Sequence, residues 1–220
     1  MIIQTKNMYK YIDAEKKLPI LSDIKVEIQE GEFVSIMGPS GSGKSTLLGI
    51  LAGIDSATQG SVYIEEQDIT KLSEKQICKF RNKNIGMVLQ APNLIETITA
   101  LENVEMPFAF SKVSADIKRA KDLLKIMGLG DKEKCYPKQL SGGEAQRVAI
   151  ARALSCSPKI IMADEPTGAL DSKNGKLVID IFKDIVKKDK VTIVMVTHDL
   201  KLAQKTDRII YIEDGRICNV

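Results

Sequence analysis

The feature that most constrains this chain is a run rich in glycine and serine, placed between an apolar stretch and a helical one. The apolar stretch spans residues 33–37, and the helix opens at Thr46 and is expected to stop near Gly53. The run between them is Gly38, Pro39, Ser40, Gly41, Ser42, Gly43, Lys44 and Ser45. It satisfies the pattern GxxxxGK[ST] in the order strand, loop and helix, which predicts a loop that binds the phosphates of a nucleotide.

The chemistry of such a loop follows from its residue types. Glycines allow consecutive backbone N–H groups to converge on phosphate oxygens, and the start of the following helix adds the positive end of its dipole. Lys44 is expected to reach the β and γ phosphates, and the Ser45 hydroxyl is expected to bind Mg²⁺. The alternative is an ordinary turn with an exposed lysine, but that alternative does not account for the flanking strand and helix. The sequence therefore predicts a nucleotide site.

A pair of adjacent acids supplies the second half of this site. The apolar run 160–163 ends in Asp164 and Glu165. If that run is a strand of a parallel sheet, the two acids lie at the carboxyl edge, where open α/β folds bind ligands. Asp164 is expected to hold Mg²⁺ through water, and Glu165 to polarise the attacking water as a general base. The alternative is a solvent-exposed acidic turn after a strand.

Hydrophobic patterning predicts an α/β fold. Short apolar runs recur between helical patterns, at residues 33–37, 62–64, 160–163, 191–196 and 209–212. One helix is expected to be capped by Ser114 and to end at Gly128, and another to run through Leu177, Ile181 and Ile185. Strands that alternate with helices indicate a mostly parallel sheet covered on both faces.

Two regions depart from that alternation. Residues 92–154 show helical patterns and loops without a clear strand, which predicts a helical lobe inserted into the core. The first 30 residues and residues 60–90 are expected to be rich in strands and to form an antiparallel layer beside the core. No internal repeat or linker interrupts the chain, so residues 1–220 are expected to form one domain.

Another glycine-containing turn begins at Ser141. Ser141 and Glu144 form a capping-box pattern that opens a helix, and Gly142 and Gly143 lie inside its first turn. Glycines there weaken a helix, which capping alone does not explain. They are explained if an anion such as a phosphate must approach the exposed N–H groups closely. Because the chain already has its own phosphate loop, this turn is expected to serve a nucleotide held by a second subunit, in a head-to-tail dimer with two ATP molecules.

Composition argues against several other classes. Lys and Arg number 32 against 29 Asp and Glu, so the net charge of +3 gives no reason to expect nucleic acid as a partner. The start, MIIQTKNMYK, has no signal-peptide pattern, and the run 191–196 is much shorter than the roughly 20 residues that a bilayer requires. Cys78, Cys135, Cys156 and Cys218 form no CxxC pair, which favours a reducing compartment and gives no metal geometry.

Together these segments resemble the ATP-binding cassette (ABC) ATPases, and the resemblance covers nearly the whole chain. Residues 140–144, LSGGE, resemble the family's signature motif, 38–45 its Walker A loop and 160–165 its Walker B strand. The resemblance implies a P-loop NTPase core that binds ATP and Mg²⁺ and hydrolyses ATP. It places Thr46 beside the phosphates and gives catalytic roles to Lys44, Glu165 and His198.

The same resemblance assigns smaller motifs. Gln90 resembles the Q-loop glutamine that touches Mg²⁺ and the membrane partner, and Asp171 belongs to a segment like the D-loop. His198, the chain's only histidine, resembles the switch histidine that contacts the γ-phosphate. Tyr11 best matches the aromatic residue that stacks on adenine, with Tyr9 as its competitor. By chemistry alone Gln90, Asp171 and Tyr11 are ordinary surface or turn residues.

The amino-acid sequences of these motifs are similar to those of the subfamily that contains lipoprotein-releasing, macrolide-exporting and antimicrobial-peptide-resistance systems. That similarity implies a cytoplasmic subunit bound at the inner face of the membrane through a separate permease, whose coupling helix meets residues 94–101. The alternative is that the apolar residues of 94–101 form the core of the helical lobe. Pro92 stands where many relatives carry an aromatic residue. The alternative function is a soluble ABC-type ATPase acting on nucleic acid or ribosomes. The short interval between Gln90 and Ser141 leaves no room for the long coiled coils of chromosome-organising relatives.

Overall fold

The computed structural model describes residues 1–12, 18–110 and 116–218. Its centre is a six-stranded sheet in the order β11-β10-β4-β9-β8-β7. Every neighbouring pair is parallel except β10 and β11. The strands are β4 (Phe33–Met37), β7 (Ile85–Val88), β8 (Ile160–Asp164), β9 (Thr192–Val196), β10 (Arg208–Glu213) and β11 (Arg216–Cys218). The predicted α/β fold with a mostly parallel sheet is confirmed.

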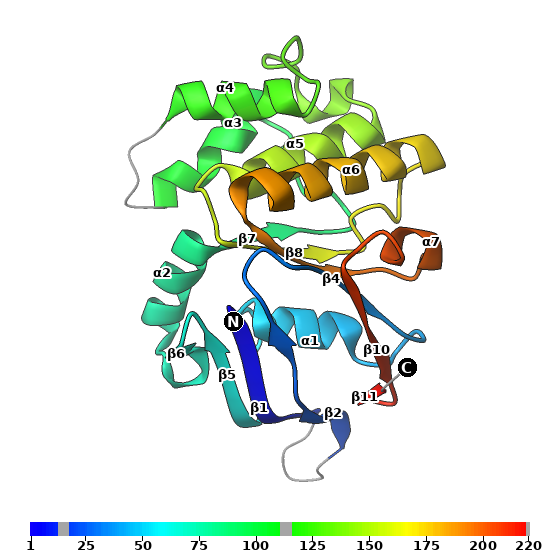
Figure 1. Cartoon of the computed structure of the whole chain (residues 1–220). Helices are drawn as coiled ribbons and strands as arrows, with labels where there is room; N and C mark the ends of the chain where they lie inside the picture. The colour runs from blue at the N-terminus through cyan, green and yellow to red at the C-terminus, as the bar shows by residue number, and fades with distance from the viewer. Residues whose placement is uncertain (13–17, 111–115, 219–220) are drawn as a thin grey trace.

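Two hydrophobic cores lie on the two faces of this sheet. Alternate residues of one strand enter different cores: Val34 and Ile36 enter the first, and Phe33 enters the second. Helix α1 (Lys44–Leu51) fills the first core together with the antiparallel sheet, and α5 (Gly142–Leu154) and α6 (Ser172–Asp189) cover the opposite face (Figure 1). Burial on both faces explains why these strands read as continuous apolar runs.

The antiparallel layer is a five-stranded sheet with the path β2-β1-β5-β6 and with β3 paired to β1. Its strands are β1 (Ile3–Tyr11), β2 (Pro19–Ile24), β3 (Glu27–Ile28), β5 (Gln59–Ile64) and β6 (Gln67–Asp68). Strand β2 touches the glycine-rich loop, because a Cβ atom added to Gly43 would lie 2.7 Å from Leu21 Cδ2. The layer therefore holds the loop in place.

The expectation of strands throughout residues 60–90 is wrong in its middle part. A short 3-10 helix, η1 (Ile69–Lys71), and helix α2 (Glu74–Asn84) separate β6 from β7. The reason is local: Ser73 and Gln76 form a capping box, with the Ser73 N–H donating to Gln76 Oε1 at 2.9 Å. Charged and amide side chains then favour a helix over a strand.

The segment 92–154 holds α3 (Ala100–Glu105), α4 (Ile117–Ile126) and α5, with the 3-10 helices η2 (Met106–Phe110) and η3 (Pro137–Gln139). The described residues of this segment include no strand, while its division from the core as a separate lobe stays a prediction. Asp116 caps α4 by accepting from the Arg119 N–H at 2.9 Å, and the expected cap, Ser114, lies outside the described residues. Gly128 follows the helix with φ +71°, as predicted for a C-terminal stop.

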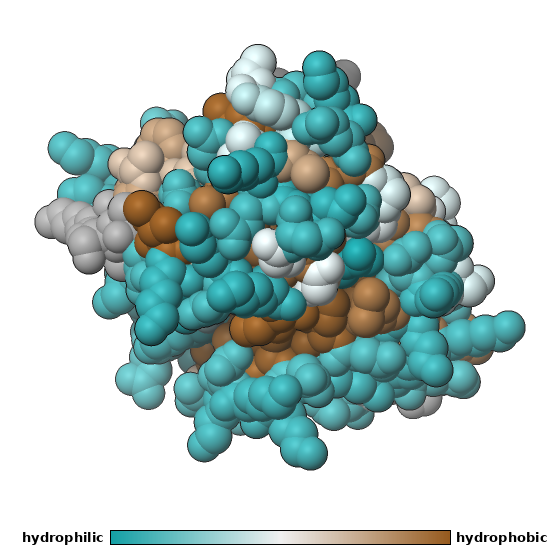
Figure 2. Space-filling model, turned by 90° about the horizontal axis from the view of Figure 1, so that it is seen from above, coloured by the Kyte–Doolittle hydropathy of each residue, from teal (hydrophilic) through white to brown (hydrophobic). Residues whose placement is uncertain are grey.

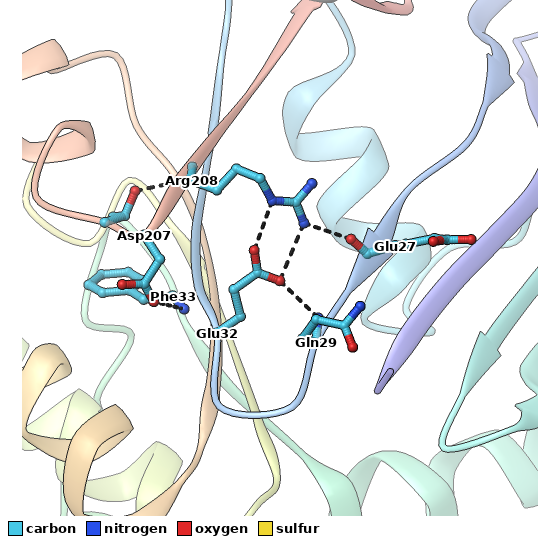
Figure 3. A network of polar contacts seen from close by, with 7 residues as sticks. Glu27, Gln29, Glu32, Phe33, Asp207 and Arg208 are labelled. Atoms are coloured by element: carbon cyan, nitrogen blue, oxygen red, sulfur yellow. Dashed lines mark hydrogen bonds and ion pairs between the residues drawn. The ribbon is translucent and has the colours of Figure 1, made fainter.

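A polar cluster fixes the start of β4. Arg208 donates from Nε to Glu32 Oε1 at 2.8 Å and from Nη2 to the Glu27 carbonyl at 2.6 Å (Figure 3). The Phe33 N–H donates to Asp207 Oδ2 at 2.9 Å, so the strand that leads into the glycine-rich loop is tied at its origin to the neighbouring strand β10.

Hydrophilic side chains cover most of the face that carries the helices, and hydrophobic ones are gathered in small areas of it (Figure 2). Within the described residues, no helix combines the length and the apolar character that crossing a membrane requires.

Candidate nucleotide site

The glycine-rich loop arches over its own lysine. Lys44 is buried at 9% exposure, and its Nζ atom donates to the Pro39 carbonyl at 2.6 Å. Helix α1 begins at Lys44 without a side-chain cap, so the N–H groups of its first turn have no intrahelical partner. A buried cation and uncapped helical N–H groups at one place form a site for an anion.

Gly38 has to be glycine for two reasons. Its φ is +148°, a value that side chains disfavour, and an added Cβ atom would lie 1.9 Å from the Ile212 carbonyl oxygen. Gly43 also has a positive φ of +98°, while Gly41, at φ +78°, faces open space. The loop is therefore closely packed against β10 at one end and open at Gly41.

Ser45 and Asp164 meet across the edge of the sheet. Ser45 Oγ donates to Asp164 Oδ1 at 3.2 Å, which joins the start of α1 to the end of β8. Burial is the main reason that the pKa of Asp164 is raised, with the neighbouring Glu165 charge adding to it and Ser45 and Lys44 opposing it. A hydroxyl and a carboxylate are hard oxygen donors, the kind that Mg²⁺ prefers. The described residues contain no group of three or more His, Cys, Asp or Glu side chains able to hold a metal. Mg²⁺ is commonly held by one or two carboxylates together with substrate phosphates and water.

Glu165 and His198 face one another beside this pair. His198 Nδ1 lies 3.1 Å from Glu165 Oε1, and the side chains are 68% and 25% exposed. The ends of β8 and β9 are joined here, because the Glu165 N–H donates to the Val196 carbonyl at 3.0 Å. Glu165 has φ 45°, a left-handed conformation that turns the chain sharply after the strand. The acid and the imidazole therefore come from neighbouring strand ends.

Gln90 reaches the same place from β7. A Cβ atom added to Gly168 would lie 3.0 Å from Gln90 Nε2 and 3.2 Å from Glu165 Oε2, so both side chains flank Gly168. The Leu89 carbonyl just before Gln90 accepts from the buried Gln146 Nε2 at 2.9 Å. Gln146 of α5 thus anchors the segment that carries Gln90.

The turn at Ser141 has the predicted capping box. The Ser141 N–H donates to Glu144 Oε2 at 2.7 Å, and the Glu144 N–H donates to Ser141 Oγ at 3.3 Å. Its two glycines differ: a Cβ atom on Gly142 would meet nothing within 4 Å, whereas one on Gly143 would lie 2.8 Å from Asn174 Cγ. Gly142 therefore leaves the backbone open to the outside, whereas Gly143 is closely packed against Asn174 within the chain.

Two further predicted residues, Asp171 and Tyr11, make contacts within the chain. Asp171 caps α6 by accepting from the Asn174 N–H at 2.8 Å, and hydrogen bonds from Asn174 lower its pKa. It lines a cavity of about 520 Å³ together with Glu165 and His198. Tyr11 stacks on Tyr9 with ring centroids 6.2 Å apart, so the two candidates for an adenine contact lie together.

Three side chains that hold the site and its surroundings were missed by sequence reasoning. Asn174 bridges Asp171 and Arg147, and Asn103 is fully buried with its Oδ1 accepting from the Ile95 N–H at 2.8 Å. Arg152 donates to the carbonyls at 92 and 93, both at 2.8 Å. The Asn174–Arg147 contact and the Arg152 contacts join residues far apart in the sequence, so no local pattern signals them.

Comparisons with known proteins agree with this geometry. The profile of the family described as "ABC transporter" matches residues 21–168. The chain is 50% identical over 222 residues to an uncharacterized ABC transporter ATP-binding protein, MJ1508, of Methanocaldococcus jannaschii, covering 100% of this chain and 99% of that one. It is 42% identical to the lipoprotein-releasing system ATP-binding protein LolD of Pseudoalteromonas translucida, over 99% and 95% of the two chains.

A solved structure is also similar. It is described as a dimeric, post-hydrolysis state of the ATP-binding cassette MJ0796 bound to ADP and Pi, and it matches with a TM-score of 0.91 and 45% identity over 99% of this chain and 97% of that one. The fold and the site define a P-loop ATPase of the cassette type. The chain belongs to the ABC transporter family.

Proposed function

We propose that this chain is the ATP-hydrolysing, nucleotide-binding subunit of an ABC transporter. The observation that carries the proposal is the convergence of Lys44, Ser45, Asp164, Glu165 and His198 at the carboxyl edge of one parallel sheet. That edge is where open α/β sheets bind ligands. The ATP-binding relatives and the ADP-bound cassette of similar structure support the same activity.

The residues present fit Mg²⁺ held between the phosphates and the protein. Ser45 Oγ and Asp164 are the donors, with Asp164 acting through water and Gln90 approaching from β7. When bound, Mg²⁺ neutralises charge on the β and γ phosphate oxygens. Residues 38–46 supply backbone N–H groups to the phosphates, and the Lys44 ammonium leaves Pro39 to reach them.

Glu165 and His198 carry out the proton chemistry and the γ-phosphate contact. The Glu165 carboxylate follows Asp164 directly at the end of β8, and there it orients the attacking water and accepts its proton. His198, largely exposed, is free to turn from Glu165 towards the γ-phosphate. Tyr11 or Tyr9 stacks on adenine.

A second copy of the chain completes the site. Among the described residues, no hydrogen bond or ion pair joins the phosphate loop at 38–46 to the turn at 140–144. In a head-to-tail dimer, residues 141–144 of one protomer close on the nucleotide of its partner, and Asp171 lies at the same junction. The dimeric state of the similar cassette supports this arrangement. Closure and release couple ATP to conformation through differential affinity.

The partner that uses this cycle is a separate membrane permease, which holds the chain at the inner face of the membrane. The lipoprotein-releasing relative supports such a partner. Residues 92–154 act as the helical lobe that meets it. Asn103 and Arg152 stiffen the segment at 92–99 through backbone hydrogen bonds, and Ile95 is 38% exposed there, suited to an apolar contact.

Two measurements test the proposal. The purified wild-type chain is expected to release phosphate from ATP, and Glu165→Gln is expected to bind ATP without releasing it, while Lys44→Ala binds it weakly. Tagged Glu165→Gln protein with ATP is then used to capture partners from solubilised membranes. A stoichiometric multi-span protein supports the transporter role. Recovery of ribosomes or nucleic acid would instead favour a soluble ATPase and overturn that role.

A further inference from the structure

We infer that Asn174 is a positioning residue that fixes the turn at Ser141 relative to the segment at Asp171, and so sets the geometry in which the dimer closes. The inference rests on the proposed function, because it concerns the turn that serves the partner's nucleotide. It assigns a role to a side chain that neither binds nucleotide nor belongs to the motifs above.

Both polar atoms of the Asn174 side-chain amide form hydrogen bonds. Its Oδ1 atom accepts from Arg147 Nη1 at 3.1 Å, and its Nδ2 atom donates to Asp171 Oδ2 at 2.8 Å. The cationic neighbour requires an acceptor and the anionic neighbour requires a donor, so the amide has one satisfactory orientation. Neither aspartate nor leucine, which have similar shapes, supplies both groups.

Asn174 also meets the turn itself. A Cβ atom on Gly143 would lie 2.8 Å from its Cγ, 3.0 Å from its Oδ1 and 3.2 Å from its Nδ2. The planar amide therefore packs flat on the backbone of the first turn of α5. Because Gly143 has an ordinary helical backbone, this contact, and not a positive φ, is the constraint within the chain.

Arg147 connects the amide to the rest of the turn. Among the described residues Asn174 Oδ1 accepts the hydrogen bond of this guanidinium, and the buried Nε atom has no partner. The Arg147 charge also helps to lower the pKa of Glu144, whose carboxylate caps the same turn. The chain of contacts from Asp171 through Asn174 to Arg147 thus joins the start of α6 to the start of α5.

This arrangement couples two segments that the proposed dimer uses together. The segment from Gly168 to Asp171 adjoins Glu165. In the proposed dimer, the turn at Ser141 faces the partner. With the amide in place, a displacement of one segment is passed to the other. Without it, each segment moves independently, and closure must order both.

The test is a double-mutant cycle in the Glu165→Gln background, reading the ATP-dependent dimerisation constant by sedimentation. Asn174→Ala is expected to weaken the dimer roughly ten-fold, the effect of losing a hydrogen bond to a charged group, with ATP affinity of the single chain unchanged. Gly143→Ala is expected to weaken it more, because the new methyl group meets the amide. In the Gly143→Ala/Asn174→Ala double variant the dimer recovers to the level of Asn174→Ala.

Matched controls separate positioning from general stability. Asn82→Ala removes another helical asparagine hydrogen bond, from Nδ2 to the Phe110 carbonyl at 3.2 Å, and Gly49→Ala adds a methyl group 3.9 Å from Asp55 Cβ. Both are expected to leave the dimerisation constant unchanged. A wild-type constant for Asn174→Ala, or equal harm from Gly143→Ala with and without Asn174, would overturn the inference.

Amide hydrogen exchange in the single chain tests the inference without a dimer. Asn174→Ala is expected to speed exchange at residues 142–144 while the melting temperature changes no more than in Asn82→Ala. Unchanged exchange there contradicts the positioning role. If Glu165→Gln fails to dimerise with ATP but amide exchange at residues 142–144 rises in Asn174→Ala, the proposed function is contradicted while the positioning role of Asn174 is supported.

Discussion

His198 Nδ1 lies 3.1 Å from Glu165 Oε1, so the chain's only imidazole and the carboxylate at the end of β8 are already paired across two adjoining strand ends. The pair joins the two groups to which the proposed mechanism gives different tasks. His198 is mostly exposed and Glu165 is not, so we expect the imidazole to be the partner that moves.

The single histidine makes this movement measurable. In Glu165→Gln protein, ATP with Mg²⁺ is expected to shift the imidazole resonances of His198, because the ring moves from the side chain at position 165 to the γ-phosphate. ADP, which lacks that phosphate, should produce a smaller change. Histidine-selective NMR makes the comparison, and identical spectra with ATP and ADP would remove His198 from the γ-phosphate.

The glycine-rich loop gives a stability prediction. Gly38→Ala is expected to destabilise the chain by at least about 2 kcal/mol more than Gly41→Ala, since both carry positive φ but only the first meets backbone. Urea unfolding without nucleotide checks the difference. Equal losses in the two variants would mean that the contact with the Ile212 carbonyl does not constrain the loop.

The capping box gives a pH prediction. Hydrogen bonding from the Ser141 N–H is the main reason that the pKa of Glu144 is below its ordinary 4.5. A lowered carboxyl pKa stabilises the folded chain above 4.5, and that stability is lost as the pH falls through the folded value. Wild type is therefore expected to exceed Glu144→Gln in unfolding free energy at pH 7, and the difference should vanish in stronger acid. A constant difference across that range contradicts the assignment.

Asn103 gives a prediction for the segment that faces the proposed permease. Its Nδ2 atom donates to the carbonyls of Ile95 and Thr99 at 3.1 and 3.0 Å, and its side chain is fully buried. Asn103→Ala is expected to cost about 2–4 kcal/mol, because it leaves a cavity and removes the side-chain hydrogen bonds to the backbone of Ile95 and Thr99. It should also raise amide exchange at Ile95. Loss of stability without faster exchange would place the defect elsewhere.

Strands were well predicted because burial on both faces produces an unambiguous apolar run. The run 33–37 coincides with β4, and 160–163 falls one residue short of β8. Helix α2 was missed because only Ile77 and Phe80 mark its apolar side among charged and amide residues, and its capping box at Ser73 was not recognised. Helix α4 was predicted, but Asp116 caps it where Ser114 was expected.

The spacing of the motifs predicted the residues of the site but not the side chains that hold them in position. Lys44, Asp164 and Glu165 were found because strand, loop and helix order carries them to one edge. Asn174 was not, since its partners Arg147 and Gly143 are distant in sequence and an asparagine on a helix carries no local signal. Gly143 was attributed to anion approach for the same reason, because nothing in the sequence brings Asn174 beside it.

The most direct test of the central claim is the mass of Glu165→Gln protein by sedimentation in the presence of ATP and Mg²⁺. The variant is expected to be a dimer with ATP and a monomer without nucleotide. It is not expected to dimerise when Lys44→Ala is introduced as well. Its ATP-bound dimer is expected to dissociate far more slowly than that of the wild-type chain. A chain that binds ATP yet stays monomeric at every concentration, or a variant dimer that decays at the wild-type rate, would contradict the account.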